Sequence, residues 1–175
     1  MIAKLSLAVL LAASVYAGNL TFESGLIKAH TEVFGDSTID PWTKKATSHL
    51  VMDDAPATLH GSVEIGMLSL MSDNKKRDEH MQEAVESALF PKAVFEIKDV
   101  VVKGDGNYTL KGMMTLHGVT KAMNFEGNIA QEGNKVHIKA TGSLKMSDYG
   151  IKPIKLMFLT VRDQVDVNVD LSLKR

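Results

Sequence analysis

The residues best suited to metal binding in this chain are its six histidines, at positions 30, 49, 60, 80, 117 and 137. They form no His-x-His or His-Glu-x-x-His pattern, the spacings that place two metal ligands on one element. The acidic residues at 53–54 and 73–78 lack the glycine turn of a calcium-binding loop. We therefore expect no metal site and no cofactor.

Catalytic patterns are also missing from the sequence. The chain has no cysteine and no Gly-x-Ser-x-Gly, Walker or dinucleotide-binding glycine motif. His117 and Asp148 would form an acid–base pair if the fold brought them together, but nothing in their spacing favours catalysis over binding. We predict that the protein is not an enzyme and has no catalytic residues.

The first 17 residues have the three parts of a secretory signal peptide. Lys4 provides the positive start, residues 5–15 are apolar, and Val15-Tyr16-Ala17 supplies the small residues of a cleavage site. We expect cleavage after Ala17 and a location in a bacterial periplasm, which the absence of cysteine favours over an extracellular fluid. The apolar segment is far shorter than the roughly 20 residues that span a bilayer, so we expect no transmembrane segment.

Residues 18–175 have the length of one domain, which can bury a core without disulfides. The formal net charge of the chain is −1, and loss of the single positive charge of Lys4 would leave about −2. This balance gives no support to nucleic acid as a partner. We interpret the short basic runs at 44–45 and 75–77 as solvated loop charge.

Strands separated by turns account for most of the domain. At the end of the chain, Val165, Val167, Val169, Leu171 and Leu173 alternate with polar residues, as in a strand with one buried face. Turns rich in Gly and Asn predict two hairpins. Their strands are expected at 94–102 with 108–116 and at 123–130 with 135–146, and further strands at 20–33, 47–52 and 59–71.

One segment follows a helical period instead. Between residues 78 and 89, Met81, Val85 and Leu89 recur at every fourth position, and Pro91 then ends the pattern. Asp78 is placed to cap this helix or to favour its positive end. With about eight strands in sequential order, the sequence predicts an all-β protein: an eight-stranded antiparallel up-and-down barrel with one short helical insertion.

Small residues and methionines are mixed into the faces expected to point inward. Gly112, Ala140 and Gly142 are small, and nine of the ten methionines follow residue 17. Flexible methionine suits a wall that adapts to a long chain, but it also fills ordinary cores. Periodicity alone leaves open whether the barrel is hollow or solid.

Four segments, in order, resemble the signature of the YceI-like family. They are Arg77-Asp78-Glu79-His80, Phe90-Pro91, the run Leu-Lys-Gly-Met-Met-Thr-Leu-His-Gly-Val-Thr-Lys at 110–121, and Ser-Asp-Tyr-Gly-Ile at 147–151. Residues 24–55 depart from the usual form of the family. The resemblance implies a lipocalin-like barrel in the bacterial periplasm that holds a long isoprenoid or similar amphiphile, and homodimers are known in the family.

The inward-facing positions and the resemblance together define an expected site. The expected cavity wall consists of Met67, Phe95, Ile97, Leu110, Met114, Met123, Phe125, Ile138, Leu144, Val167 and Val169. The expected mouth, where polar groups would hold a head group, consists of Trp42, His117, Thr120, Asp148 and Tyr149.

Each mouth residue also has a structural interpretation. His117 would cap a turn, Asp148 and Tyr149 would shape a bend, and Trp42 would plug one end of the barrel. An ion pair between Arg77 and Asp78 would position the helix, and His80 would be a surface or packing residue.

We therefore expect a periplasmic binding or carrier protein for a long-chain amphiphile, such as an isoprenoid, a quinone-like molecule or a fatty-acyl derivative. Two alternatives stay open: a solid-core stress or interaction protein without a ligand, and a lipid-modifying enzyme. The first would require large side chains facing Gly112, Ala140 and Gly142 across the barrel.

Overall fold

The structure is a computed structural model that describes residues 18–33, 37–152, 155–156 and 159–175. The signal peptide expected at residues 1–17 lies outside the described residues, so cleavage after Ala17 stays a prediction.

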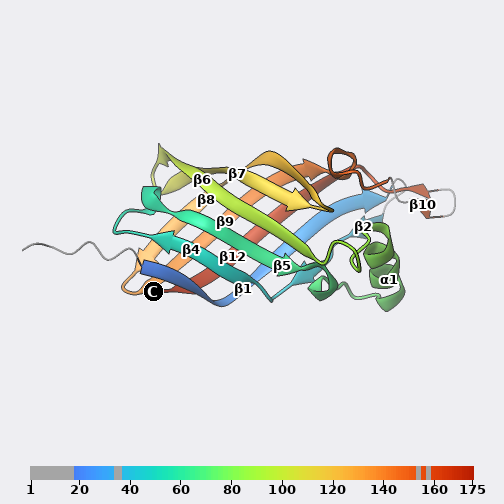
Figure 1. Cartoon of the computed structure of the whole chain (residues 1–175), viewed down its shortest axis with the longest axis horizontal. Helices are drawn as coiled ribbons and strands as arrows, with labels where there is room; N and C mark the ends of the chain where they lie inside the picture. Colours follow the sequence, from blue (N-terminus) through green and yellow to red (C-terminus); the bar gives the residue numbers. More distant parts are fainter. Residues whose placement is uncertain (1–17, 34–36, 153–154, 157–158) are drawn as a thin grey trace, which may run out of the picture.

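Eight antiparallel strands form a closed barrel, as the sequence predicts (Figure 1). In chain order they are β1 (Gly18–Val33), β4 (Thr47–Met52), β5 (His60–Gly66), β6 (Lys92–Gly104), β7 (Asn107–Leu116), β8 (Val119–Glu132), β9 (Lys135–Lys145) and β12 (Gln164–Lys174). Each strand pairs with the next in this order, and β1 then pairs with β12. That last pairing runs from Thr21 opposite Lys174 to His30 opposite Asp166. It gives backbone partners to the two strands that would otherwise form sheet edges.

Both predicted hairpins are confirmed. The turn between β6 and β7 contains Gly104, Asp105 and Gly106, all with positive φ, and the turn between β8 and β9 contains Gly133 at φ 61°. The strands expected at 20–33 and 47–52 are also confirmed to within a few residues. Turn residues and the alternation of apolar and polar residues were therefore enough to predict most of the barrel strands.

The strand expected at 59–71 is wrong at its end, because β5 stops at Gly66. Gly66 lies opposite Lys92, the first residue of β6, so the partner strand has ended at this point. Pro91 precedes Lys92, and its carbonyl accepts a hydrogen bond from the Met67 backbone N–H at 2.8 Å. The chain then turns into a short 3-10 helix, η2 (Met67–Ser69).

The predicted helix is present, but its bounds differ. Helix α1 spans Lys75–Ala84, so it begins three residues before the predicted segment at residue 78 and ends five residues before its last residue, 89. Asn74, not Asp78, is the cap, since its side chain accepts a hydrogen bond from the Arg77 N–H. Glu86 takes a left-handed conformation at φ 48°, which ends the helical path and leaves Leu89 70% exposed.

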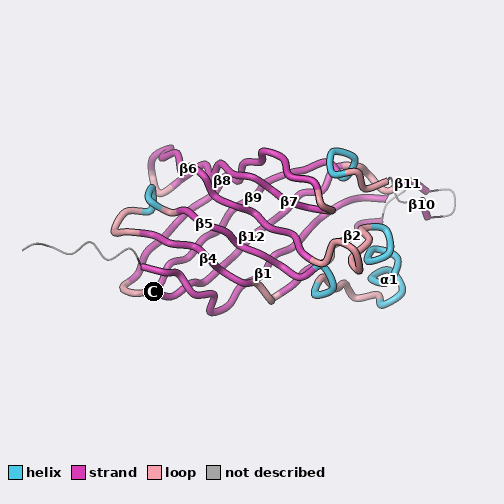
Figure 2. Tube along the Cα trace, in the orientation of Figure 1, coloured by secondary structure: helices cyan, strands magenta, loops and turns pink. Residues whose placement is uncertain are grey.

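The remaining elements are short. They are β2 (Ser37–Ile39) and β3 (Trp42–Thr43), which pair with β1, β10 (Lys155–Leu156), which pairs with β11 (Leu159–Thr160), and the 3-10 helices η1 (Pro56–Thr58) and η3 (Met146–Tyr149). Figure 2 shows α1, β2, β10 and β11 at one end of the barrel, which we call the helix end. The chain's C-terminus lies at the opposite end.

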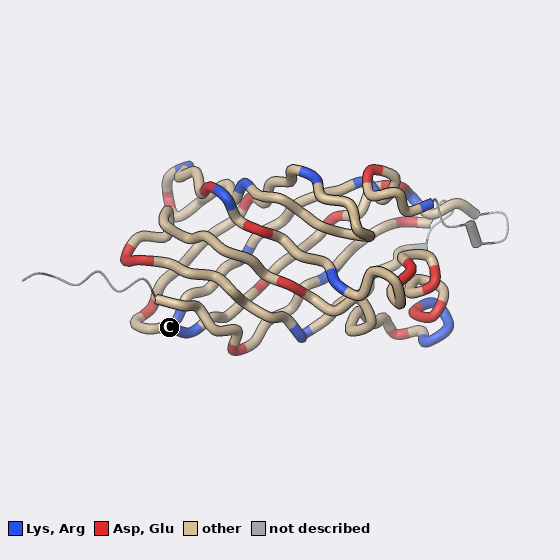
Figure 3. The backbone as a smooth tube through the Cα atoms, in the orientation of Figure 1, with Lys and Arg blue, Asp and Glu red and all other residues tan. Residues whose placement is uncertain are grey.

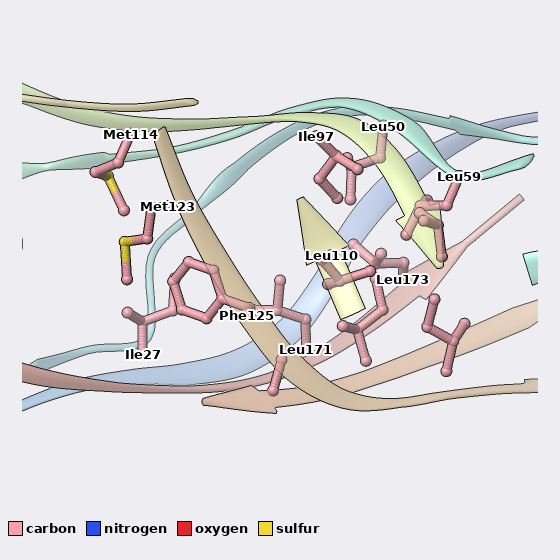
Figure 4. Close-up of a cluster of buried hydrophobic side chains, with 14 of the residues drawn as sticks. Ile27, Leu50, Leu59, Ile97, Leu110, Met114, Met123, Phe125, Leu171 and Leu173 are labelled. Carbon is pink, nitrogen blue, oxygen red and sulfur yellow. The ribbon is translucent and has the colours of Figure 1, made fainter. Parts of the chain in front are cut away.

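That opposite end of the barrel is solid, and we call it the plugged end. Its core residues come from segments far apart in the sequence and are exposed by no more than 2% of their surface: Leu20, Leu50, Met52, Leu59, Val136 and Leu173. Figure 4 shows Leu50, Leu59, Leu110 and Leu173 converging in this core. Leu173 lies opposite both Phe22 and Val136, so it packs where β1 and β12 close the barrel.

We expect Leu173→Ala to lower the free energy of unfolding by about 2–5 kcal/mol, because the change leaves a cavity at the closing seam. Urea unfolding of the purified protein measures this value. The control is Val102→Ala on β6, where the side chain is 59% exposed and the expected change is within about 0.5 kcal/mol. Equal losses in the two variants would contradict a packed plugged end.

Candidate ligand-binding cavity

A cavity of about 440 Å³ occupies the barrel toward the helix end. It is lined by later residues of β1, β5, β7 and β9 and by early residues of β6 and β12, which meet at this end because the strands are antiparallel. Residues of α1 complete the lining. The volume lies within the range of about 300–1,000 Å³ that is typical of ligand pockets.

The wall of the cavity is made almost entirely of apolar side chains. Along β12, Val165, Val167, Val169 and Leu171 face the cavity, while Asn168 and Asp170 between them are exposed. Leu50 and Leu171 line the cavity, and each lies two residues before a side chain of the plugged end, Met52 on β4 and Leu173 on β12, so they form the floor where the cavity meets that end. The cavity is therefore blind at one end.

Two phenylalanine rings occupy the space beside the glycines of the wall. Phe95 and Phe125 meet edge to face, with ring centroids 4.8 Å apart. A Cβ on Gly112 would lie 2.7 Å from the Phe95 ring, and a Cβ on Gly142 would lie 3.0 Å from the Phe125 ring. The absence of a side chain at these glycines thus leaves room for a phenylalanine ring of the adjacent strand, whereas Ala140 lines the cavity itself. The interior is neither wholly filled nor wholly open.

The structure places ten of the eleven expected wall residues at the cavity: Met67, Phe95, Ile97, Leu110, Met114, Phe125, Ile138, Leu144, Val167 and Val169. The exception is Met123, which is buried but packs its methyl group against Gly142 beside Phe125. Sequence reasoning missed wall residues outside the regular strands, including Leu70, Met146, Ile151 and Val161. No period in the sequence marks such loop positions.

The five expected mouth residues do not gather at the cavity, and none of them is among its described lining residues. His117 and Gly118 have φ values of 51° and 72°, which form the two-residue turn between β7 and β8. The Nδ1 atom of His117 contacts the Tyr149 carbonyl oxygen at 3.0 Å, and Nε2 contacts a Glu86 carboxylate oxygen at 2.6 Å. The Phe90 ring packs on the imidazole at a centroid distance of 4.3 Å. His117 therefore ties loops together, and its ring nitrogens contact Tyr149 and Glu86 rather than Asp148.

The other four expected mouth residues also have structural partners. Tyr149 is buried, and this burial, reinforced by the nearby Asp148 charge, raises the pKa of its phenol. Asp148 lies 3.4 Å from the Lys121 ammonium on the surface, and the Thr120 hydroxyl contacts the Thr115 hydroxyl at 2.8 Å. Trp42 exchanges backbone hydrogen bonds with Met71, and the Lys44 ammonium lies 5.6 Å from its ring centroid.

Apart from Thr31 on β1, the polar part of the cavity lining comes from helix α1 and its N-cap residue Asn74. The lining residues within α1 are Lys76, Arg77, His80 and Met81. The N-cap residue Asn74 and the C-cap residue Val85 also line the cavity. Lys76 and His80 are exposed to solvent as well, so the cavity reaches the surface beside this helix.

The interpretation of residues 75–77 as solvated loop charge is wrong about the loop, because all three residues lie in α1. Lys75 and Lys76 are exposed as that interpretation expects, while Lys76 and Arg77 also line the cavity. The expected ion pair of Arg77 with Asp78 is also absent, since Arg77 lies 3.6 Å from Asp73.

Among the described residues, no group of three His, Asp or Glu side chains converges as a metal site would require. Within the same residues, no helix has both the length and the apolar character needed to cross a bilayer.

The match to a family model for the YceI-like domain covers residues 19–173. A UPF0312 protein of Yersinia pestis (strain Pestoides F) is 33% identical over 107 residues, which are 57% of this chain and 55% of that protein. The matched region is thus about half the length of this relative.

Two solved structures share the fold. BcnA of Burkholderia cenocepacia has a TM-score of 0.75 at 18% identity, covering 85% of this chain and 95% of its own. A polyisoprenoid binding domain from Saccharophagus degradans, implicated in plant cell wall breakdown, has a TM-score of 0.67 at 12% identity, covering 89% of this chain and 98% of its own.

We expect His117→Ala to lower the free energy of unfolding by about 1–3 kcal/mol, because a partner of the Tyr149 carbonyl and of Glu86 is lost. Urea unfolding measures the loss. His49→Ala, at an exposed position on β4, is the control and should stay within about 0.5 kcal/mol. A head-group role for His117 would give the opposite pattern: unchanged stability and weaker ligand binding.

A carboxylate also holds the rim of the helix end. Asp163 accepts hydrogen bonds from the Ser147 hydroxyl at 2.6 Å and from the Ser147 backbone N–H at 2.8 Å. These bonds, the hydroxyl bond above all, lower the pKa of Asp163 below its ordinary value of 3.8. A lowered folded-state pKa stabilises the protein above the unfolded value, and this contribution is lost as the pH falls through the folded value.

Asp163→Asn should therefore be less stable than the parent at neutral pH, by less than about 1.5 kcal/mol because the carboxyl lies near solvent. The difference should shrink as the pH falls below the ordinary carboxyl pKa of 3.8. Urea unfolding of both proteins across the acid range measures it, and a gap that does not change with pH would contradict this role.

Proposed function

The chain belongs to the YceI-like family, and on this premise we propose that it binds a long-chain amphiphile in its barrel cavity and carries it through the periplasm. The ligand would be an isoprenoid, a quinone-like molecule or a fatty-acyl derivative. The observation that carries the proposal is the apolar cavity, blind at its floor and open beside α1.

The energetics of chain burial support this proposal. Each buried methylene contributes about 0.8 kcal/mol, so a chain of about 16 carbons has a gross driving force near 13 kcal/mol. Micromolar binding needs about 8.2 kcal/mol. The difference is available to offset the ordering of a flexible chain and the loss of its free motion. A carrier would be useful in an aqueous compartment where the free amphiphile aggregates.

We propose binding rather than catalysis because the best acid–base candidate is committed elsewhere. Both ring nitrogens of His117 contact protein oxygens, and the residue lies outside the described cavity lining. The structural neighbour from Saccharophagus degradans is named as polyisoprenoid binding, which supports the same class of activity. The periplasmic location rests on the predicted signal peptide.

Native mass spectrometry tests the proposal on protein purified from a periplasm, with solvent extraction to identify any bound molecule. We expect a stoichiometric long-chain species. A bare polypeptide mass that is unchanged after incubation with polyprenyl and fatty-acyl lipids would overturn the proposal and favour a ligand-free interaction protein.

We expect Ile138→Trp to block lipid uptake while the barrel still folds, because Ile138 lines the cavity and is 2% exposed. The matched control is Lys139→Trp, the next residue of β9, which is exposed on the outer face. Lipid loading per protein is measured by native mass spectrometry, and circular dichroism reports folding. Leu110→Trp, at a second wall position, should behave as Ile138→Trp does. Normal loading in both cavity variants would count against the cavity as the binding site.

A further inference from the structure

We infer that Lys76 and Arg77, together with His80, form a site for an anionic head group on the molecule whose chain fills the cavity. The inference rests on the proposed function and narrows it to acidic amphiphiles, those that end in a carboxylate or a phosphate. It begins from the sign of the charges at the mouth.

The charged residues among the described cavity lining are both cationic. Lys76 and Arg77 line the cavity, His80 adds a titratable imidazole, and no Asp or Glu of the described residues is part of the wall. Their positions on α1 put them beside Met81 and Val85, which also face the cavity. The same helix face is thus apolar toward the barrel interior and basic toward the mouth.

The three acidic residues of α1, Asp78, Glu79 and Glu83, are not part of this face, and Glu83 is exposed outside the lining. The Asp78 carboxylate accepts hydrogen bonds from the Ser72 backbone N–H at 2.8 Å and from its hydroxyl at 2.6 Å. Glu79 lies 4.0 Å from Lys75, an exposed residue outside the lining. Figure 3 shows basic and acidic segments close together on this helix. The helix therefore carries charges of both signs, and it is the cationic residues that line the cavity.

The two cations are available to a ligand. Among the described residues, no carboxylate lies within 4.0 Å of Lys76. Arg77 has Asp73 at 3.6 Å, but the Asp73 side chain is 92% exposed, and such surface pairs contribute little. A carboxylate or phosphate at the mouth would take the place of this weak partner and accept charge-assisted hydrogen bonds from the guanidinium.

The apolar wall fixes where such a head group would lie. A charge inside the cavity would lose its hydration without compensation, which is strongly unfavourable. The chain would therefore extend toward the floor at Leu50 and Leu171, while the head group stays at the mouth beside α1. The barrel interior then selects for an apolar chain, and the helix selects for the charge.

The test compares three probes of equal chain length on the lipid-depleted full protein: a fatty acid, an alkyl monophosphate and the neutral primary alcohol. We expect the Kd of at least one anionic probe to be about tenfold lower than that of the alcohol. Lys76→Gln combined with Arg77→Gln should remove this preference, so that the three probes bind this variant with similar Kd, and circular dichroism checks that the variant is folded.

The matched control is Lys75→Gln combined with Lys174→Gln. It removes the same net charge from exposed positions outside the cavity lining, and it should keep the preference for the anion. A preference for the fatty acid identifies a carboxylate head group, and a preference for the alkyl phosphate identifies a phosphate.

Equal affinity for all three probes would overturn the head-group inference while leaving the proposed function in place. The same holds if the control pair removes the preference as fully as the pair at the mouth, because the effect would then come from net charge. Failure to bind any probe, the alcohol included, would overturn the proposed function itself.

Discussion

The pairing of β1 with β12 is the constraint on which the rest of this structure depends. The two strands lie at opposite ends of the chain, and their ladder turns an open meander into a closed wall. Once the wall is closed, alternation along each strand sends one set of side chains inward and the other outward. An apolar interior separated from water follows from this closure, because an open sheet of the same strands would leave both edges and one apolar face exposed.

A single closed wall encloses two different interiors. At the plugged end, side chains from β1, β4, β9 and β12 meet at the centre, and Leu59, ahead of β5, completes the packing. At the helix end, the chain leaves the barrel after Gly66 and returns at Lys92, so α1 lies over the opening instead of filling it. Gly112 and Gly142 leave room for the Phe95 and Phe125 rings to lie close to the sheet. The cavity is therefore a consequence of where the long insertion leaves the sheet.

The sequence allowed the barrel and most of its inner wall to be predicted, because apolar residues occupy every second position of a strand with one buried face. The valines of β12 and the inward residues of β6, β7 and β9 were identified in this way. The mouth could not be predicted by the same route. Whether Lys76 lines a cavity depends on how α1 packs on the barrel, which is set by contacts between distant segments. The end of β5 and the end of α1 were misplaced for a related reason, since Pro91 and the conformation of Glu86 act through tertiary partners.

The segments that carry the family resemblance both line the cavity and support it, since Arg77, Leu110 and Ile151 belong to the lining. Phe90, His117 and Tyr149 come from three of those segments and meet in one cluster, where His117 also binds Glu86, two residues beyond the end of α1. On the other side of the helix, Met71 is bound to Trp42, and Ser72 is bound to Asp78. These contacts hold α1 at the mouth from both ends. The apolar barrel wall offers, in its described part, no polar contacts that would distinguish one head group from another, so any preference for a head group must come from the helix. Because contacts on both sides hold α1 in place, substitutions can change the charge of its inner face without disturbing the barrel. The barrel therefore holds the apolar chain of the ligand, and the helix separately recognises its head group.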